Sequence, residues 1–112
     1  MNVPVYIIPP CDGVELSLNF VFDGYADETT WEILDAEGEE VLSGGPYSQG
    51  QASASFVYCM EPGTYTFTVF DEYGDGLSYP KDGSVTLSAG GEVIFEAIGN
   101  FGGSATSTFT LE

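Results

Sequence analysis

Basic residues are almost missing from this chain. It contains no histidine and no arginine, and Lys81 stands alone against 18 Asp and Glu, so the formal net charge is −17 at pH 7. A nucleic-acid-binding surface needs Lys or Arg to displace phosphate counterions, and anionic membrane surfaces attract the same residues. Both kinds of partner are therefore excluded. The long apolar run of a membrane-spanning helix is also absent, so we expect no membrane insertion.

The missing histidine removes the commonest general base as well. Nucleophilic triads depend on such a base next to the nucleophile. A glycosidase needs only two carboxylates, but a domain of 112 residues has little room for a deep, preorganised cleft. We therefore expect a protein without catalytic activity.

Cysteine is scarce too, with only Cys11 and Cys59. Their wide separation excludes the short CxxC pairs of zinc and redox motifs. A disulfide, which is typical of secreted proteins, is favoured over two buried free thiols. Met1 leads into Asn2 without the basic and apolar regions of a secretory signal. We interpret it as a start placed before a mature domain, and the alternative is a native cytosolic start.

Apolar and polar residues alternate with a period of two along most of the chain, which is typical of half-buried strands. Glycine, proline, aspartate and asparagine separate most of the segments, and no window has helical periodicity. We predict an all-β fold, an antiparallel β-sandwich of the jelly-roll or Ig-like kind with seven to eight short strands, and a closed small barrel as the alternative. The expected strands cover 14–22, 30–33, 40–42, 54–58, 64–70, 85–87, 93–95 and 105–111.

Residues 1–10 are predicted to form an extension that precedes one domain over residues 11–112. The stretch Asn2–Ile8 is apolar and β-prone, and Pro9-Pro10 separates it from the first expected strand. The favoured interpretation is an edge strand of the same domain, since Pro4 suits an edge. The alternative is a donor strand that completes the sheet of a neighbouring subunit.

Two acidic segments, residues 23–32 and residues 71–77, follow expected strands and predict a metal site. Calcium takes six to eight oxygen ligands from carboxylates, backbone carbonyls and water, and Mg²⁺ is less suited because it demands octahedral geometry. Glycines in the second segment allow a sharp turn, so that the carbonyl of Leu77 can point inward. Clustered carboxylates are costly without a counter-ion, which favours Ca²⁺ over solvated turn residues. The predicted calcium ligands are Asp23, Asp27, Glu28, Asp71, Asp75, Leu77 and Asp82.

The second segment matches part of the EF-hand pattern. Asp71, Asp75 and Gly76 fall at positions one, five and six, and Asp82 falls at position twelve. Tyr73 occupies position three, however, and the flanking segments are strands. A calcium loop on a β scaffold therefore fits better than an EF-hand.

The spaced motifs of this chain resemble a domain that recurs in secreted multidomain proteins of marine Bacteroidetes and some algae. That domain has a leading Cys, an "ETSW" box, a second Cys before "GxYTFTxxDxYGDG", and a late glycine-rich "GG.FG". The corresponding stretches here are Cys11, Glu28–Trp31, Cys59, Gly63–Gly76 and Phe101–Gly103.

The resemblance implies an extracellular accessory β-module, with Asp23, Glu28, Asp71 and Asp75 near a metal and Cys11 paired with Cys59. Many relatives have further cysteines after "GDG", whereas Leu77-Ser78-Tyr79-Pro80 follows here. A second disulfide is therefore not expected in that loop.

Tyrosines beside the acidic segments are the remaining feature. An exposed ring can stack on a sugar, although tyrosines also pack ordinary turns. We expect Tyr25, Tyr73 and Tyr79 to contact a ligand. The predicted function is an extracellular, calcium-binding β-sandwich module that binds a polysaccharide or cell-surface glycan or acts in adhesion. The alternative is a self-assembling filament subunit that uses residues 2–8 as a donor strand, with calcium at the joints.

Overall fold

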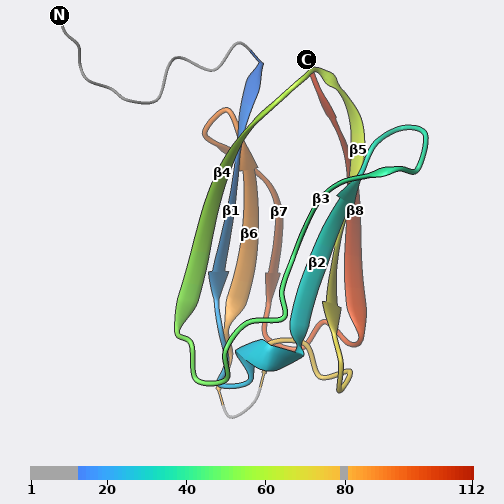
Figure 1. Cartoon of the computed structure of the whole chain (residues 1–112). Coiled ribbons are helices and arrows are strands. Elements are labelled where there is room, and N and C mark those ends of the chain that lie inside the picture. Colours follow the sequence, from blue (N-terminus) through green and yellow to red (C-terminus); the bar gives the residue numbers. More distant parts are fainter. Residues whose placement is uncertain (1–12, 79–80) are drawn as a thin grey trace, which may run out of the picture.

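Two four-stranded antiparallel sheets pack face to face in the computed structural model, which describes residues 13–78 and 81–112 (Figure 1). The β-sandwich prediction is confirmed, and each predicted strand segment lies on an observed strand. The predicted extension over residues 1–10, with Cys11 and Tyr79, lies outside the described residues. The strands are β1 (Val14–Val21), β2 (Thr29–Leu34), β3 (Glu40–Gly44), β4 (Ser53–Met60), β5 (Gly63–Asp71), β6 (Ser84–Ala89), β7 (Glu92–Ile98) and β8 (Ser104–Leu111).

The two sheets are interlocked by their connections. One sheet has the order β4-β1-β6-β7, and the other has the order β3-β2-β5-β8. The consecutive strands β1 and β2 therefore lie in opposite sheets, and so do β4 and β5, which pair with them. Because every pairing is antiparallel, the loops after β1, β3, β5 and β7 all lie at one end of the sandwich, the lower end in Figure 1. We call it the loop end.

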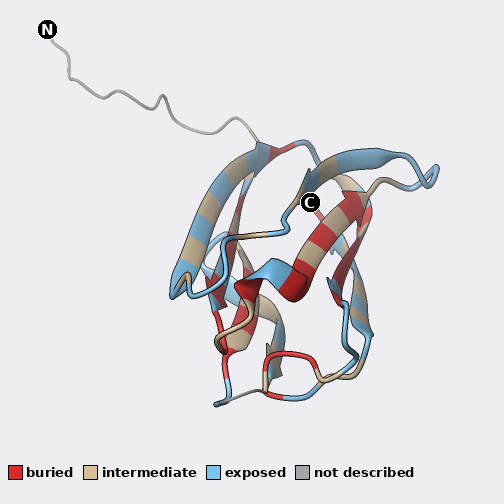
Figure 2. Cartoon of the chain, turned by 60° about the horizontal axis from the view of Figure 1, so that its bottom comes forward, coloured by how far each residue is buried: buried red, intermediate tan, exposed pale blue. Residues whose placement is uncertain are grey.

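Alternating side chains of both sheets form the core between them (Figure 2). Trp31 at its centre is 2% exposed, and its indole Nε1 donates a hydrogen bond of 2.7 Å to the hydroxyl of Tyr47. This bond satisfies the polar atom of a buried ring, as such rings require. The largest fully buried side chains are Trp31, Phe20, Phe67, Leu16, Leu18, Ile33, Leu77 and Leu87.

The opposite end of the sandwich carries two short turns, one between β2 and β3 and one between β6 and β7. In the β2–β3 turn, the backbone N–H of Gly38 donates to the carbonyl of Asp35 at 2.9 Å. In the β6–β7 turn, Gly90 and Gly91 have φ values of 59° and 86°, a left-handed pair that suits a two-residue hairpin. Tight turns therefore connect β2 with β3 and β6 with β7.

Cys59 lies near the end of β4 and is disulfide-bonded. Its expected partner Cys11 lies outside the described residues, so the pairing of Cys11 with Cys59 stays a prediction. Within residues 13–78 and 81–112, the helical content is one short 3-10 turn, η1 (Ala26–Glu28), which the sequence did not predict. No helix in this part of the chain is long and apolar enough to cross a membrane.

Candidate metal site at the loop end

The register between β2 and β5 brings the two acidic segments together. Thr29, the first residue of β2, pairs with Asp71, the last residue of β5. Glu28 directly precedes Thr29, and its carbonyl accepts a hydrogen bond of 3.0 Å from the backbone N–H of Glu72. Carboxylates from two segments far apart in the sequence therefore meet where β2 begins and β5 ends.

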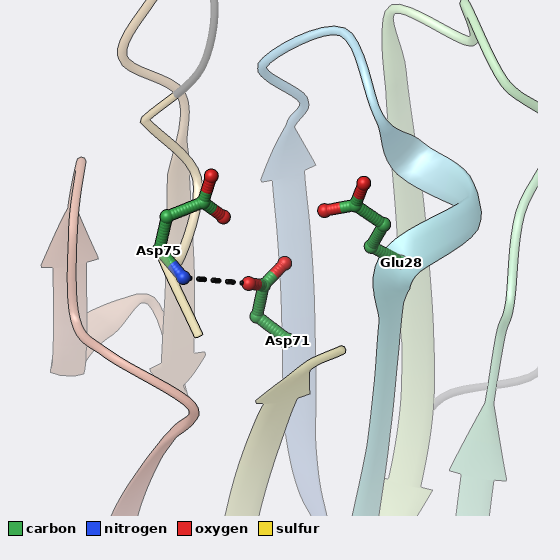
Figure 3. Close-up of side chains that lie close together, drawn as sticks. All are labelled: Glu28, Asp71 and Asp75. Carbon is green, nitrogen blue, oxygen red and sulfur yellow. Dashed lines mark hydrogen bonds between the residues drawn. The ribbon is translucent and has the colours of Figure 1, made fainter. Parts of the chain in front are cut away.

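The loop after β5 folds back so that Asp75 joins Asp71. The backbone N–H of Asp75 donates to Oδ2 of Asp71 at 2.9 Å, as drawn in Figure 3. The hydroxyl of Ser78 then donates to the carbonyl of Asp75 at 2.6 Å. Gly76 has a φ of +62°, and a Cβ there would lie 2.7 Å from the carbonyl oxygen of Gly99 and would clash with the backbone nitrogen of Phe101. This close approach to the β7–β8 loop requires glycine.

Three carboxylates form the resulting cluster, which we call the acidic triad: Glu28, Asp71 and Asp75. One carboxylate oxygen from each lies within 4.8 Å of the other two. Figure 3 shows the carboxylates of Asp75 and Glu28 on either side of Asp71. Glu28 is 9% exposed, Asp71 is 5% exposed, and Asp75 is half-buried. Like charges at this spacing repel strongly away from bulk water.

The pKa values of two triad members are raised by burial and by this crowding. Burial, followed by the negative charges of Asp71 and Asp75, raises the pKa of Glu28 to about 7. Burial and the side chain of Asp75 raise the pKa of Asp71 to about 6. Both carboxyls therefore hold a proton more tightly in the metal-free fold than in the unfolded chain. A divalent cation would relieve the same repulsion without a proton.

One carboxylate oxygen of the triad, Oδ1 of Asp75, and one hydroxyl beside it, Oγ1 of Thr29, lack a hydrogen-bond partner within the described part of the chain. Thr29 is fully buried on β2, on the same face of the strand as Trp31, and it lies directly across from Asp71. Buried polar atoms are almost always paired, so an unpartnered hydroxyl here points to a missing ligand or water. Thr29 was not among the ligands predicted from the sequence, although two of its features could have identified it: it lies on the same strand face as Trp31, and it directly follows Glu28.

The other predicted ligands do not belong to the acidic triad. Asp23 is buried, and its Oδ1 accepts a hydrogen bond of 2.9 Å from the backbone N–H of Tyr25. Asp27 is exposed, although its charge and that of Asp23 both raise the pKa of Glu28. The carbonyl of Leu77 accepts a hydrogen bond of 2.6 Å from the N–H of Gly83, which stabilises the loop.

Asp82, the last predicted ligand, is exposed. Its carboxylate lies close to Gly99: a Cβ added at that glycine would be 3.1 Å from the carboxylate carbon. Asp82 therefore lies over the β7–β8 loop.

A surface pocket of about 440 Å³ opens beside the triad, and its lining residues are Tyr25, Glu28, Tyr73 and Asp75. Two of the tyrosines predicted to contact a ligand thus flank two of the triad carboxylates. Tyr73 is 76% exposed, and Tyr25 is partly buried. A volume of this size lies within the range of small-ligand pockets.

A second pocket, of about 350 Å³, reaches the triad through other residues. Its lining includes Glu28 and Asp71 together with Asp27, Thr30 and Phe70. The triad is therefore open to solvent through both pockets, so an ion bound there would keep coordination positions for water or a ligand.

Neither the known protein-family models nor the curated proteins contain a match to this chain. The resemblance to the secreted accessory domain consequently rests on the spaced motifs alone, and the function has to be argued from the geometry of the loop end.

Proposed function

We propose that this protein is a non-catalytic, extracellular calcium-binding β-sandwich module that presents a glycan-binding pocket beside the ion. The observation that carries the proposal is the acidic triad, whose carboxylate oxygens lie within 4.8 Å of one another. The raised pKa values of Glu28 and Asp71 follow from burial and from the same crowding of carboxylates, and the unpartnered hydroxyl of Thr29 is a second, separate observation.

The chemistry of the donors favours calcium. All of the candidate ligands are oxygens, which suit hard cations, and the chain has no histidine for a softer metal. Three carboxylates and one hydroxyl leave several positions of a calcium ion to water, backbone carbonyls or a ligand. Calcium tolerates such irregular shells, whereas Mg²⁺ requires near-ideal octahedral geometry.

Calcium would also have a structural effect. An ion on the triad would connect the start of β2, the end of β5 and the loop after β5. That loop already contacts the β7–β8 loop, since the N–H of Leu77 donates to the carbonyl of Gly99 at 2.9 Å. Binding would therefore order two loops and remove like-charge repulsion between them.

A polyhydroxylated ligand fits the pocket beside the ion. Sugar hydroxyls are neutral oxygen donors that can complete a calcium shell, and the rings of Tyr25 and Tyr73 offer apolar faces with a polar tip. The chain's charge of −17 disfavours acidic ligands, unless the ion itself binds them. We therefore expect a neutral polysaccharide or cell-surface glycan. The disulfide at Cys59 agrees with a secreted setting.

Calorimetric titration with CaCl₂ tests the ion, alongside MgCl₂ and NaCl at matched ionic strength. We expect saturable binding of calcium and a higher melting temperature in calcium than in either control. An equal rise in NaCl would mean that salt only screens the negative charges, and it would overturn the proposal.

Binding to insoluble neutral polysaccharides, with calcium or with chelator, tests the pocket. Tyr73→Ala should weaken calcium-dependent retention, while calcium binding itself persists. Val57→Ala is the matched control, because Val57 is also well exposed, at 63%, but lies on β4 away from the loop end. Retention that is equal in chelator would contradict a role for the ion.

A further inference from the structure

The edge strands of the two sheets differ in how they are protected. The edges are β4 and β7 in one sheet, and β3 and β8 in the other. Strand β7 carries Glu92 and Glu96 and pairs with β6 through a shifted register. Strand β3 has only five residues, includes Glu40, and also pairs through a shifted register. Charges, short length and bulges are the usual devices that prevent edge-to-edge association.

Strand β8 has none of these devices. It runs for eight residues, Ser104–Leu111, without a charged residue or a proline. All eight residues pair with β5 in one continuous register. In a chain of net charge −17, a strand of this length without a carboxylate is an unusual surface, because a second copy can approach it with little local repulsion.

A ladder of threonine pairs lies on the outer face of β5 and β8. The hydroxyls of Thr64 and Thr110 are 3.0 Å apart, and the pairs Thr66–Thr108 and Thr68–Thr106 are each 3.1 Å apart. Cross-strand threonine pairs stabilise antiparallel sheets. The threonines of β8 that pair with threonines of β5 can therefore also pair with threonines of a strand that adds to the open side of β8.

The inner face of β8 is incompletely covered. On the neighbouring central strand β5, the inward residues Tyr65, Phe67 and Val69 are at most 9% exposed. On β8, the inward residues Ala105, Ser107 and Phe109 are only half-buried, while Leu111 at the end of the strand is buried. Apolar surface at this edge is thus available for further burial.

We propose that β8 is a self-association edge, where it pairs antiparallel with β8 of a second copy and joins two four-stranded sheets into one. A two-fold axis at Ser107 places Thr106 opposite Thr108 and Ser104 opposite Thr110. This register repeats on the outer face the hydroxyl pairing that β8 makes with β5. On the inner face it sets Ala105 opposite Phe109, a small residue against a large one. A two-fold interface of this kind is self-complementary.

Strand β4 is the competing edge, since it is also eight residues long and uncharged. Its residue Cys59 is disulfide-bonded, whereas β8 contains no cysteine. A two-fold axis at Val57 would set Phe56 opposite Tyr58, two large rings on the inner face. This register therefore lacks the pairing of a small with a large residue that the two-fold axis at Ser107 gives on β8.

Sedimentation velocity from about 1 to 100 μM, in NaCl that shortens the screening length to about 8 Å, tests the proposal. We expect a reversible monomer–dimer equilibrium. The double variant Thr106→Asp/Thr108→Asp should raise the dimer dissociation constant about tenfold or more, because it sets carboxylates opposite one another across the axis. Thr64→Asp/Thr66→Asp is the matched control, with the same added charge on the same ladder but on a central strand.

Hydrogen exchange of the wild-type protein gives a second readout that does not depend on how the variants fold. The outward backbone N–H groups of residues 104–111 should gain protection as concentration rises, while those of β3 should not. A monomer across the whole range would overturn the proposal. So would a dimer that resists the β8 variant but is lost in Ser55→Asp/Val57→Asp on β4, or on deletion of residues 1–9, which would indicate a donor strand.

Discussion

Two acid-rich regions at opposite ends of the sandwich behave very differently. The β2–β3 turn holds four carboxylates within six residues, Asp35–Glu40, and the acidic triad draws three from two distant segments. The turn is largely exposed, and Oδ1 of Asp35 accepts hydrogen bonds from the N–H groups of Glu37 and Glu39 at 2.9 and 3.0 Å. The triad is mostly buried, and one of its carboxylate oxygens has no partner within the described residues.

The difference shows that the density of acids along the chain does not identify a metal site. In the turn, one aspartate stabilises its own backbone, and the other side chains extend into water, where repulsion is weak. In the triad, strand pairing holds carboxylates against one another beside the core. A metal site is therefore indicated by carboxylates that lie at the buried ends of paired strands, and not by the number of acids in a segment.

Removal of a triad carboxylate should give the largest effect. Asp71→Ala and Asp75→Ala should each abolish most of the stabilisation by calcium, which is about 2.7 kcal/mol at a hundredfold excess over the dissociation constant. Glu37→Ala in the turn removes the same charge and should leave the calcium response intact. Thermal unfolding of the three variants with calcium and with chelator measures the contrast. A loss of response in Glu37→Ala would mean that calcium acts through net charge alone.

The pH dependence of the calcium-free protein should come next in size. The pKa of Glu28 is raised from 4.5 to about 7 and that of Asp71 from 3.8 to about 6, so the folded state binds protons more tightly than the unfolded chain. This contribution to stability is fully present at acid pH and is lost as the pH rises through about 6 to 7. We expect a melting temperature several degrees lower at pH 8 than at pH 5 without calcium.

Calcium should reverse this trend, since it binds the deprotonated carboxylates. Glu28→Gln removes one of the two titrating groups and should flatten the calcium-free profile, whereas Glu37→Gln should not. A profile that is unchanged in Glu28→Gln would contradict the origin of the effect in the triad.

The glycines of the two ends offer a smaller and purely structural comparison. Gly38 in the turn has a φ of +83° with open space around it, and Gly76 has a φ of +62° with the backbone of the β7–β8 loop against it. Gly38→Ala should cost about 1 kcal/mol for the left-handed conformation alone. Gly76→Ala should cost more, about 2 to 3 kcal/mol, and should also weaken calcium binding. Urea denaturation measures the free energy of unfolding of both variants. If both substitutions lower it equally, the β7–β8 loop can move aside to accommodate a Cβ at residue 76.

Substitution of the buried hydroxyl should give the smallest effect, with opposite signs in the two states. Thr29→Val keeps the shape of the side chain and removes an unpartnered polar atom, so the calcium-free protein should gain about 1 kcal/mol. Calcium affinity should fall by up to about tenfold if Oγ1 contacts the ion or its water. Thr86→Val, on β6 of the other sheet, is the control. Unchanged affinity in Thr29→Val would exclude the hydroxyl from the site.

The alternation of residues such as Leu16, Leu18 and Phe20 determined the strands and the buried face, because a period of two can hide its apolar side in only one way. The Asp35–Gly38 and Gly90–Gly91 turns were also determined by the local sequence, since their residues favour the required backbone angles. The two acidic segments were also recognisable as a candidate site, and three of the seven predicted ligands, Glu28, Asp71 and Asp75, meet in the fold.

Only the tertiary structure decided which acids meet. The pairing of Thr29 with Asp71 depends on the register between two strands far apart in the sequence, which no local pattern specifies. The same register turns the hydroxyl of Thr29 toward the core, while backbone hydrogen bonds in the loop occupy the carbonyl of Leu77. Which of the four edges lacks protection likewise depends on sheet order, because a strand such as β8 becomes an edge only through the partners that the other strands take.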